Sequence, residues 1–240
     1  MKLYGFHPVR EILRSRPHEV ERVACAASAA GRRRQIEDLC RRHGVAFRTV
    51  ARRDLDDLAT GEASTDPPVH NGFVAWVRTA SSGETAATDM DLVVLLEDVQ
   101  DPRNLGAILR VCEGAGVGTV LVRDRGSAKV GEVAVKTSAG ATEYLSVERV
   151  VNTARTLEEL KQEGFWVYGA DAGGDAPWTA DLTGKVVLCL GGEADGLRRL
   201  TRERCDLLLG LPMRGKVASL NVATAAAALL YEAVRQRLTD

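Results

Sequence analysis

The sequence of 240 residues lacks any apolar run near the roughly 20 residues that a membrane-spanning helix needs. Its first segment, MKLYGFHPVREILRSRP, also lacks the apolar stretch of a secretory signal. Hydrophobic residues nevertheless make up 45% of the chain, enough to bury the core of one large domain or two smaller ones. We therefore expect a folded, cytoplasmic protein that does not associate with membranes.

The sequence also lacks the spacing of a disulfide framework or a metal site. Its cysteines are odd in number and widely scattered, which favours reduced structural thiols: Cys25, Cys40, Cys112, Cys189 and Cys205. The four histidines contain no pair of the HxxxH type. The acidic residues Glu97, Asp98 and Asp101 lie close together, but no second acidic group elsewhere completes a magnesium site. We expect no metal.

The chain has no overall excess of positive charge, since its formal net charge is -1. This argues against a protein that coats nucleic acid through bulk charge. The distribution is uneven, because residues 1–78 carry 14 Lys and Arg against 10 Asp and Glu, whereas residues 79–240 carry 18 against 23. An RNA-facing surface and the nucleotide composition of the genome both account for the arginines of the basic part, which include Arg32, Arg33, Arg34, Arg41, Arg42, Arg52 and Arg53.

A segment of small and polar residues, TASSGETAATD (79–89), is typical of a flexible connector between two domains. Over residues 1–78, the strand-like runs VERVACAA, VAFRTV and NGFVAWV alternate with helical stretches at 8–14 and 31–43, which predicts a small α/β domain. Over residues 90–240, five apolar runs alternate with helical segments, the pattern of a parallel sheet covered on both faces: DLVVLLED, GTVLVRD, FWVYGAD, KVVLCLGG and CDLLLGLPM. A long helix is expected over Ser219 to Leu238.

Neither GxGxxG nor GxxxxGK[ST] follows any of these strands, so a dinucleotide fold and a P-loop both lose support. Gly114, Gly116 and Gly118 stand where a helix should end and are better explained by C-capping. Two glycine-containing loops remain, LGGEADGL (190–197) and LPMRGKVASLN (211–221), each directly after a strand. Glycine lets a ligand approach the backbone, whose peptide groups can hold an adenine edge, so we favour a cofactor site over two ordinary turns.

Three motifs resemble, in the same order, those of the SpoU/TrmH methyltransferases: DPRNLGAILR (101–110), LGGEADGLRRLTRERCD (190–206) and LPMRGKVASLNVATAAAALLYEAVRQR (211–237). Other segments are similar to the rRNA guanosine 2'-O-methyltransferases of the RlmB group: YGFHPVREILRS (4–15), HNGFVAWV (70–77) and KTSAGATEYLSVERV (136–150). The resemblance spans almost the whole chain. Three ordered motifs are far more specific than a lone GExxGL.

This resemblance implies an enzyme that uses S-adenosylmethionine to methylate a ribose 2'-hydroxyl in RNA, most similar to those acting on a guanosine of 23S rRNA. It implies an α/β fold, in which the C-terminal parallel-sheet (SPOUT) domain is tied in a deep trefoil knot. A small N-terminal α/β domain like ribosomal protein L30e is implied to contact RNA, and the protein is implied to be a homodimer. A tRNA or antibiotic-resistance methyltransferase of the same fold and a non-catalytic RNA-binding protein are the alternatives.

The resemblance implies catalytic roles for Asn104, Arg110, Glu193, Ser219 and Asn221. Each also has an ordinary structural interpretation. Asn104, Ser219 and Asn221 stand where N-caps are expected, and Glu193 where it would cap the following helix. Arg110 is spaced to pair with Glu113 on the same helix. Because a guanidinium barely deprotonates, we interpret Arg110 as a phosphate anchor that stabilises the emerging alkoxide.

The implied cofactor contacts are made mostly by backbone groups, at Gly191, Gly192, Leu211, Met213, Ser219 and Leu220. The sequence departs from the family pattern at Ala194, where a glycine is usual. If that glycine has a positive φ, alanine strains the turn by ~1 kcal/mol. We expect this to leave cofactor binding intact.

Overall fold

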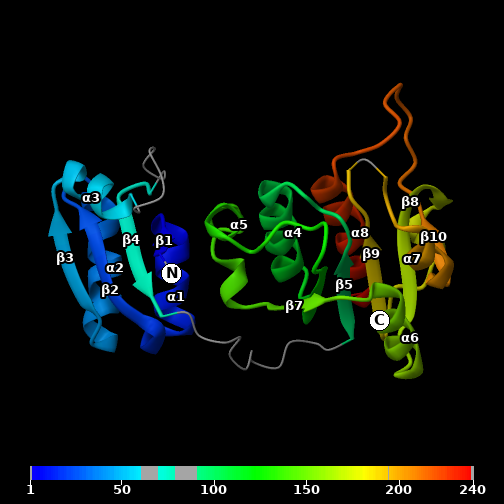
Figure 1. Cartoon of the computed structure of the whole chain (residues 1–240), viewed down its shortest axis with the longest axis horizontal. Coiled ribbons are helices and arrows are strands. Elements are labelled where there is room, and N and C mark those ends of the chain that lie inside the picture. Colours follow the sequence, from blue (N-terminus) through cyan, green and yellow to red (C-terminus); the bar gives the residue numbers. More distant parts are fainter. Residues whose placement is uncertain (1, 61–69, 79–90, 194, 239–240) are drawn as a thin grey trace. The chain divides into compact units, whose positions relative to one another are not determined.

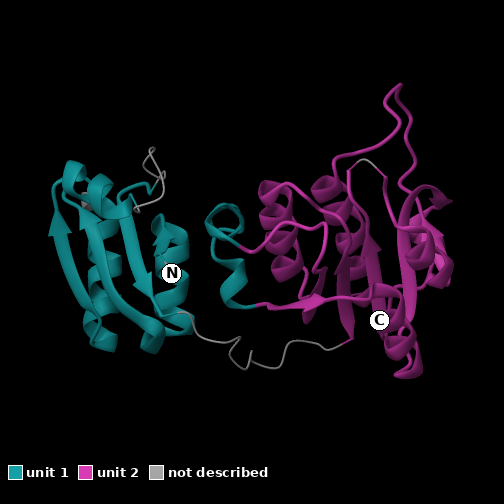
Figure 2. Cartoon of the chain, viewed as in Figure 1, with its two compact units in different colours: residues 1–83, 131–144 teal, residues 84–130, 145–240 magenta. Residues whose placement is uncertain are grey.

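The computed structural model describes residues 2–60, 70–78, 91–193 and 195–238. The chain divides into two compact units (Figures 1 and 2). Unit 1 comprises Met1–Gly83 with Gly131–Tyr144, and unit 2 comprises Glu84–Val130 with Leu145–Asp240. The connector expected at 79–89 and the turn residue Ala194 lie outside the described residues. Within the described ranges, every helix is too short or too polar to span a bilayer.

Unit 1 contains a mixed four-stranded sheet of order β1-β4-β2-β3, in which only β2 and β3 run parallel. Its strands are β1 (Lys2–Tyr4), β2 (Val20–Ala26), β3 (Ala46–Val50) and β4 (Phe73–Val77). Its helices are α1 (Phe6–Ser15), α2 (Ala30–His43), α3 (Arg52–Ala59) and α5 (Glu132–Thr137), with 3₁₀ turns η1 (Pro17–Glu19) and η2 (Ala141–Glu143). The three strands and two helices predicted for this part are confirmed, whereas β1, α3 and α5 were not predicted.

The segment 131–144 packs with unit 1 although it lies between strands of unit 2 in the chain. Arg16 forms an ion pair with the buried carboxylate of Glu143, and the Tyr144 hydroxyl donates to Glu11. Burial raises the pKa of Glu143, although Arg16 acts in the opposite direction. These contacts are not apparent from the sequence because they join residues 127 and 133 positions apart.

Unit 2 contains a six-stranded, wholly parallel sheet of order β10-β8-β9-β5-β6-β7. Its strands are β5 (Leu92–Leu96), β6 (Thr119–Arg123), β7 (Ser146–Val150), β8 (Trp166–Asp175), β9 (Val186–Leu190) and β10 (Leu207–Leu209). Its helices are α4 (Pro102–Gly114), α6 (Thr153–Gln162), α7 (Arg199–Arg204) and α8 (Val222–Arg237), with the 3₁₀ turn η3 (Pro177–Thr179). The parallel sheet and its five predicted strands are confirmed, and β7 is an addition.

Helices cover both faces of this sheet, which explains the uninterrupted apolar sequences of β5 and β9. Every residue of these two strands is buried. Val93 and Leu95 of β5 belong to a core cluster that also contains Leu157 of α6. Since strand side chains alternate, Val94 and Leu96 face the other side of the sheet. The trefoil knot and the likeness of unit 1 to ribosomal protein L30e stay predictions from the family resemblance.

The central position of β5 makes its core side chains sensitive to truncation. Leu95 is completely buried, so Leu95→Ala should lower the free energy of unfolding of unit 2 by about 2–5 kcal/mol, through lost contacts and the cavity left behind. Val151→Ala is the control, because Val151 is 78% exposed and its truncation should change this free energy by less than about 0.5 kcal/mol. Urea denaturation measures both. Equal effects would mean that β5 is not part of the core.

Candidate functional site

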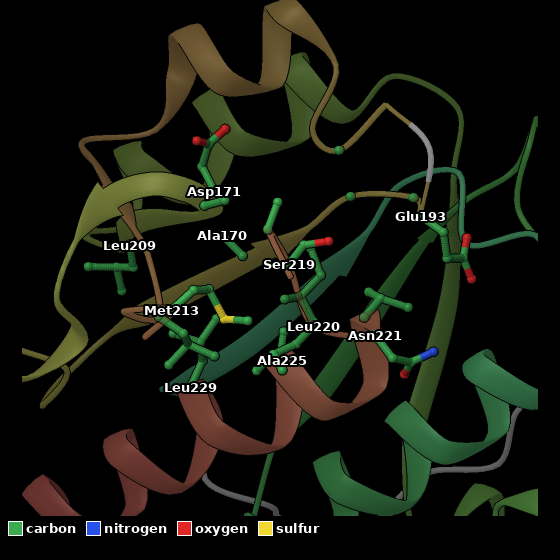
Figure 3. Close-up of a pocket in the computed structure, with 18 residues that line it drawn as sticks. Ala170, Asp171, Glu193, Leu209, Met213, Ser219, Leu220, Asn221, Ala225 and Leu229 are labelled. Atoms are coloured by element: carbon green, nitrogen blue, oxygen red, sulfur yellow. The ribbon is translucent and has the colours of Figure 1, made fainter. Parts of the chain in front are cut away.

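A cavity of about 610 Å³ lies at the carboxyl edge of the parallel sheet, between the ends of β8, β9 and β10 and the start of α8 (Figure 3). This edge is where ligands bind in open α/β sheets. The cavity is lined by Ala170, Asp171, Ala172, Leu190, Gly191, Gly192, Glu193, Gly196, Leu209, Leu211, Met213, Ala218, Ser219, Leu220, Asn221, Val222, Ala225 and Leu229. All six predicted cofactor positions are among these residues, together with Glu193 and Asn221.

The first lining loop follows β9 and requires glycine at two positions. A Cβ on Gly191 would lie 2.0 Å from the carbonyl carbon of Gly196, and one on Gly192 would lie 2.4 Å from the carbonyl oxygen of Asp98. Gly196 has a φ of +64°, and its N–H donates to the Gly192 carbonyl oxygen at 3.1 Å. The backbone of this loop is therefore packed too closely for side chains, which leaves its peptide groups to line the cavity.

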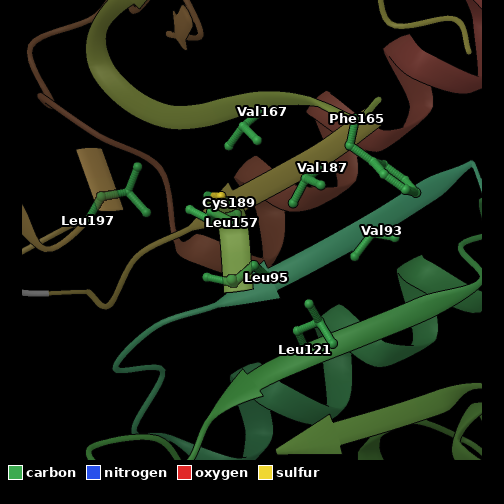
Figure 4. Close-up of a cluster of buried hydrophobic side chains, with 9 residues drawn as sticks. All are labelled: Val93, Leu95, Leu121, Leu157, Phe165, Val167, Val187, Cys189 and Leu197. Carbon is green, nitrogen blue, oxygen red and sulfur yellow. The ribbon is translucent and has the colours of Figure 1, made fainter. Parts of the chain in front are cut away.

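The loop ends in the hydrophobic core. Leu197, which is 7% exposed, belongs to the same cluster as Leu95, Leu157 and Cys189 (Figure 4). Burial of this side chain anchors the end of the loop on the α6 side of the sheet.

The second lining loop runs from β10 to α8 and contains Leu211, Met213, Ser219 and Leu220. Figure 3 shows Met213 among apolar side chains at one end of the cavity, and Asn221 toward the other end. The cavity thus has an apolar end and a polar end, an arrangement that suits a ligand of mixed polarity.

At the polar end, three of the predicted catalytic residues form one hydrogen-bonded chain. Asn104 donates from Nδ2 to Glu193 Oε1 at 2.5 Å, and Asn221 donates from Nδ2 to Asn104 Oδ1 at 3.1 Å. Each amide thus has its oxygen and nitrogen oriented by its neighbours. The structure brings together residues that are 89 and 117 positions apart in the chain.

Asn221 also caps α8. Its Oδ1 accepts from the N–H groups of Ala223 at 2.9 Å and Thr224 at 3.4 Å, so the N-cap interpretation is confirmed and coexists with the contact to Asn104. The helix therefore begins at Val222 rather than Ser219. Because Ser219 lies before the cap, its interpretation as an N-cap is wrong.

The cap interpretations of Asn104 and Glu193 are also wrong. Asp101 is the N-cap of α4, since its Oδ1 accepts from the Arg103 N–H at 2.7 Å, and Pro102 occupies the first helical position. Asn104 therefore lies inside the first turn. Helix α7 has Arg198 at its N-cap without any side-chain cap, and the Glu193 side chain points instead to Asn104.

Arg110 does not line this cavity. It is exposed on α4, and its side chain forms no hydrogen bond or ion pair with any other described residue. The interpretation as a salt bridge to Glu113 is therefore wrong. Its guanidinium is free to bind a group from outside the chain.

Sequence reasoning missed the contribution of β8 and of the α8 face, including Asp171, Ala225 and Leu229. Asp171 Oδ2 accepts from Arg202 Nη1 at 2.5 Å. Asp171 ends the apolar run FWVYGAD, and this position could have predicted its place at the site. Polar residues at the carboxyl ends of parallel strands meet at one edge of the sheet.

The described cysteine and acidic side chains form neither a disulfide nor a metal-binding group. All five cysteines are free, as predicted. A hydrogen bond with Cys205 and burial both raise the pKa of the Cys189 thiol, which keeps it protonated within β9. Among the described residues, no group of three or more His, Cys, Asp or Glu side chains is arranged to hold a metal ion.

The double role of Asn221 can be separated by substitution. Asn221→Ala removes the acceptor for the α8 amides and should lower the free energy of unfolding by about 1 kcal/mol. Asn221→Asp retains that acceptor and should remain within about 0.5 kcal/mol of the wild type, although it loses the donor to Asn104. Thermal denaturation measures both variants. An equal loss in the two would show that the contact with Asn104, rather than the cap, stabilises the helix start.

Residues 91–231 match the SpoU rRNA Methylase family, and residues 2–82 match the RNA 2'-O ribose methyltransferase substrate binding family. The chain is 42% identical over 229 residues to the 23S rRNA (guanosine-2'-O-)-methyltransferase RlmB of Xylella fastidiosa (strain 9a5c), covering 92% of this chain and 90% of that protein. It is 43% identical over 222 residues to RlmB of Xanthomonas axonopodis pv. citri (strain 306), covering 89% and 87%.

Among solved structures, the SpoU methyltransferase AviRb from Streptomyces viridochromogenes in complex with the cofactor AdoMet matches with a TM-score of 0.77 and 25% identity. The match covers 100% of this chain and 91% of AviRb. The motif resemblance, the parallel sheet and these matches agree, and the chain belongs to the SpoU rRNA methylase family.

Proposed function

We propose that this protein transfers a methyl group from S-adenosylmethionine to the ribose 2'-hydroxyl of a guanosine in 23S rRNA. The observation that carries the proposal is the cavity itself, which gathers the six predicted cofactor positions beside the Asn104–Glu193 hydrogen bond. Family membership supports the reaction. The full-length relatives, whose names specify 23S rRNA and guanosine, support the substrate.

The residues of the cavity fit S-adenosylmethionine. The crowded backbone at Gly191 and Gly192 presents peptide groups in place of side chains, as the recognition of an adenine edge needs. Met213 and Leu229 supply apolar surface. When bound, S-adenosylmethionine supplies an electrophilic methyl group on a sulfonium.

The chain's own residues orient the ribose and manage charge. Asn104 and Glu193 lie at the polar end, where hydrogen bonds can align the 2'-hydroxyl for in-line attack. Ser219 lines the same cavity, and in this role it contacts both the cofactor and the substrate. The guanidinium of Arg110, which has no partner among the described residues, anchors an RNA phosphate and stabilises the 2'-oxygen as its proton passes to water.

Unit 1 supplies RNA contacts in this proposal. Arg34, Arg42, Arg52 and Arg53 are exposed, and residues 1–78 carry the basic excess of the chain. We assign residues 1–78 to substrate binding, 79–89 to the linker and 90–240 to methyl transfer. A homodimer is proposed from the family resemblance, and sedimentation velocity tests it.

The cofactor assignment predicts a strong effect of a single methyl group. Gly191→Ala places a Cβ against the Gly196 backbone, so the loop must move and the affinity for S-adenosylmethionine should fall by at least about 100-fold. Gly215→Ala, in the neighbouring loop, meets nothing within 4 Å and should stay within about twofold. Isothermal titration calorimetry measures both. No binding by the wild type, or equal affinities in all three proteins, would refute the cofactor site.

The role of Arg110 predicts a loss of rate without loss of cofactor affinity. Arg110→Ala should lower the single-turnover rate on 23S rRNA at saturating S-adenosylmethionine by on the order of 10² to 10³, because a donor to the developing charge is removed. Arg110→Lys should restore little, since lysine lacks the planar fork. Glu113→Ala is the matched control on the same helix and should stay within about twofold. Near-wild-type turnover of Arg110→Ala would remove Arg110 from the catalytic residues.

A further inference from the structure

A buried carboxylate beside the cavity has no role in the proposed reaction. Glu97 follows β5 and has a relative exposure of 0%. Its Oε1 accepts from the hydroxyls of Thr153 at 2.5 Å and Thr201 at 2.7 Å, and its Oε2 accepts from the Arg198 N–H at 3.2 Å. The three donors come from the start of α6, from α7 and from the end of the first lining loop.

Glu97 holds both ends of that loop. Its own N–H donates to the carbonyl oxygen of Leu190 at 2.9 Å, immediately before the loop, and its side chain binds the Arg198 N–H immediately after it. Residues 191–197 lie between these two bonds and include Gly191, Gly192 and Glu193 of the cavity wall. One residue therefore fixes the span of the loop from outside the cavity.

The environment of Glu97 is unusual for a buried acid because, among the described residues, only neutral donors bind its side chain. The neighbouring guanidiniums of Arg123 and Arg198 bind Asp98 instead, at 2.7 Å and 3.2 Å. A buried carboxylate without a cationic partner is costly unless hydrogen bonds satisfy it, and an apolar residue would fill a core position at lower cost. The hydrogen bonds to the Arg198 N–H and to the hydroxyls of Thr153 and Thr201 offset that cost.

We propose that Glu97 is a positioning residue that holds the described parts of the loop, 191–193 and 195–197, in the arrangement that binds S-adenosylmethionine. This rests on the proposed function, in which that loop forms part of the cofactor site. Glu97 touches neither the cavity nor the reacting atoms. Because bound cofactor holds the same loop, and Glu193 with it, saturating cofactor offsets the lost anchor, and Glu97 governs cofactor affinity rather than the rate of methyl transfer at saturation. The hydroxyls of Thr153 and Thr201 hold the carboxylate in the orientation that reaches the loop.

The test compares Glu97→Ala, Glu97→Gln and Thr201→Val with wild type. Glutamine can keep its oxygen on the Arg198 N–H while its amide donates to the threonine hydroxyls, so it is the conservative variant. Asp206→Asn is the matched control, since this carboxylate also accepts two structural hydrogen bonds, from Lys161 and the Val167 N–H, but is not bonded to the cofactor loop. Calorimetric titration with S-adenosylmethionine, kcat and KM on 23S rRNA, and hydrogen exchange of the amides of residues 191–198 without cofactor are measured on the full chain.

We expect Glu97→Ala to raise the Kd and KM for S-adenosylmethionine by at least about 10-fold, with kcat at saturation within about threefold. Glu97→Gln should recover to within about threefold of the wild-type Kd, and Thr201→Val should fall between the two. The Arg198 amide should exchange faster in Glu97→Ala, whereas Asp206→Asn should change neither Kd nor this exchange. If Glu97→Ala does not fold, Thr201→Val carries the same comparison.

Lower thermal stability with unchanged Kd and loop exchange in the Glu97 and Thr201 variants would overturn the proposal and leave Glu97 a purely structural residue. An equal rise of Kd in Asp206→Asn would overturn it as well, because the effect would then follow general destabilisation. Failure of the proposed function looks different. The wild type itself would not bind S-adenosylmethionine, while the hydrogen-exchange comparison would still decide whether Glu97 anchors the loop.

Discussion

The parallel pairing of β5 with β9 is the constraint on which the rest of the site depends. Its register places Leu96 opposite Leu190, so the chain leaves both strands at the same point of the carboxyl edge. The backbones of Asp98 and Gly192 therefore meet, and the loop that we propose for the cofactor begins at this contact. A register shift of one residue would turn every buried side chain of a strand to the opposite face, which the two covered faces of this sheet do not permit.

Two pairs of packed helices carry the side chains that form hydrogen bonds around this edge. Helices α4 and α8 pack together and carry Asn104 and Asn221, which are joined by a hydrogen bond beside the polar end of the cavity that Asn221 lines. Helices α6 and α7 also pack together and carry Thr153 and Thr201, which hold Glu97 and through it the cofactor loop. One pair thus carries members of the hydrogen-bonded chain, and the other carries the hydroxyls that bind Glu97.

Asn221 shows why an amide suits the junction of helix and site. A serine or aspartate at this position would accept from the α8 amides, but only asparagine also presents an N–H₂ group to Asn104. The same side chain therefore starts the helix and orients the next member of the hydrogen-bonded chain. The helix cap and the contact with Asn104 therefore coexist in one residue.

The sequence by itself determined the elements and motifs whose signal is local. Strands buried on both faces have uninterrupted apolar runs, so β5 and β9 could be predicted from the sequence. The residues of β7 are only partly buried or exposed, and its mixed sequence SVERV gave no such signal. The family motifs likewise placed Gly191, Met213 and Asn221 at one cavity. The cap of α4 was misassigned to Asn104 because capping depends on where the first turn begins, which Asp101 and Pro102 decide.

Only the tertiary structure decided the strand order and the grouping of 131–144 with unit 1. The same holds for the hydrogen-bonded chain from Glu193 to Asn221 and for the bond between the Glu97 carboxylate and the Arg198 N–H. Each depends on residues tens of positions or more apart, whose neighbourhood follows from strand register and helix packing rather than from any local preference. Arg110 illustrates the same limit, because its motif predicts a catalytic role while its position on α4 leaves it outside the cavity of its own chain. Local sequence encodes which residues can be buried or bonded, and the packing of the whole chain selects their partners.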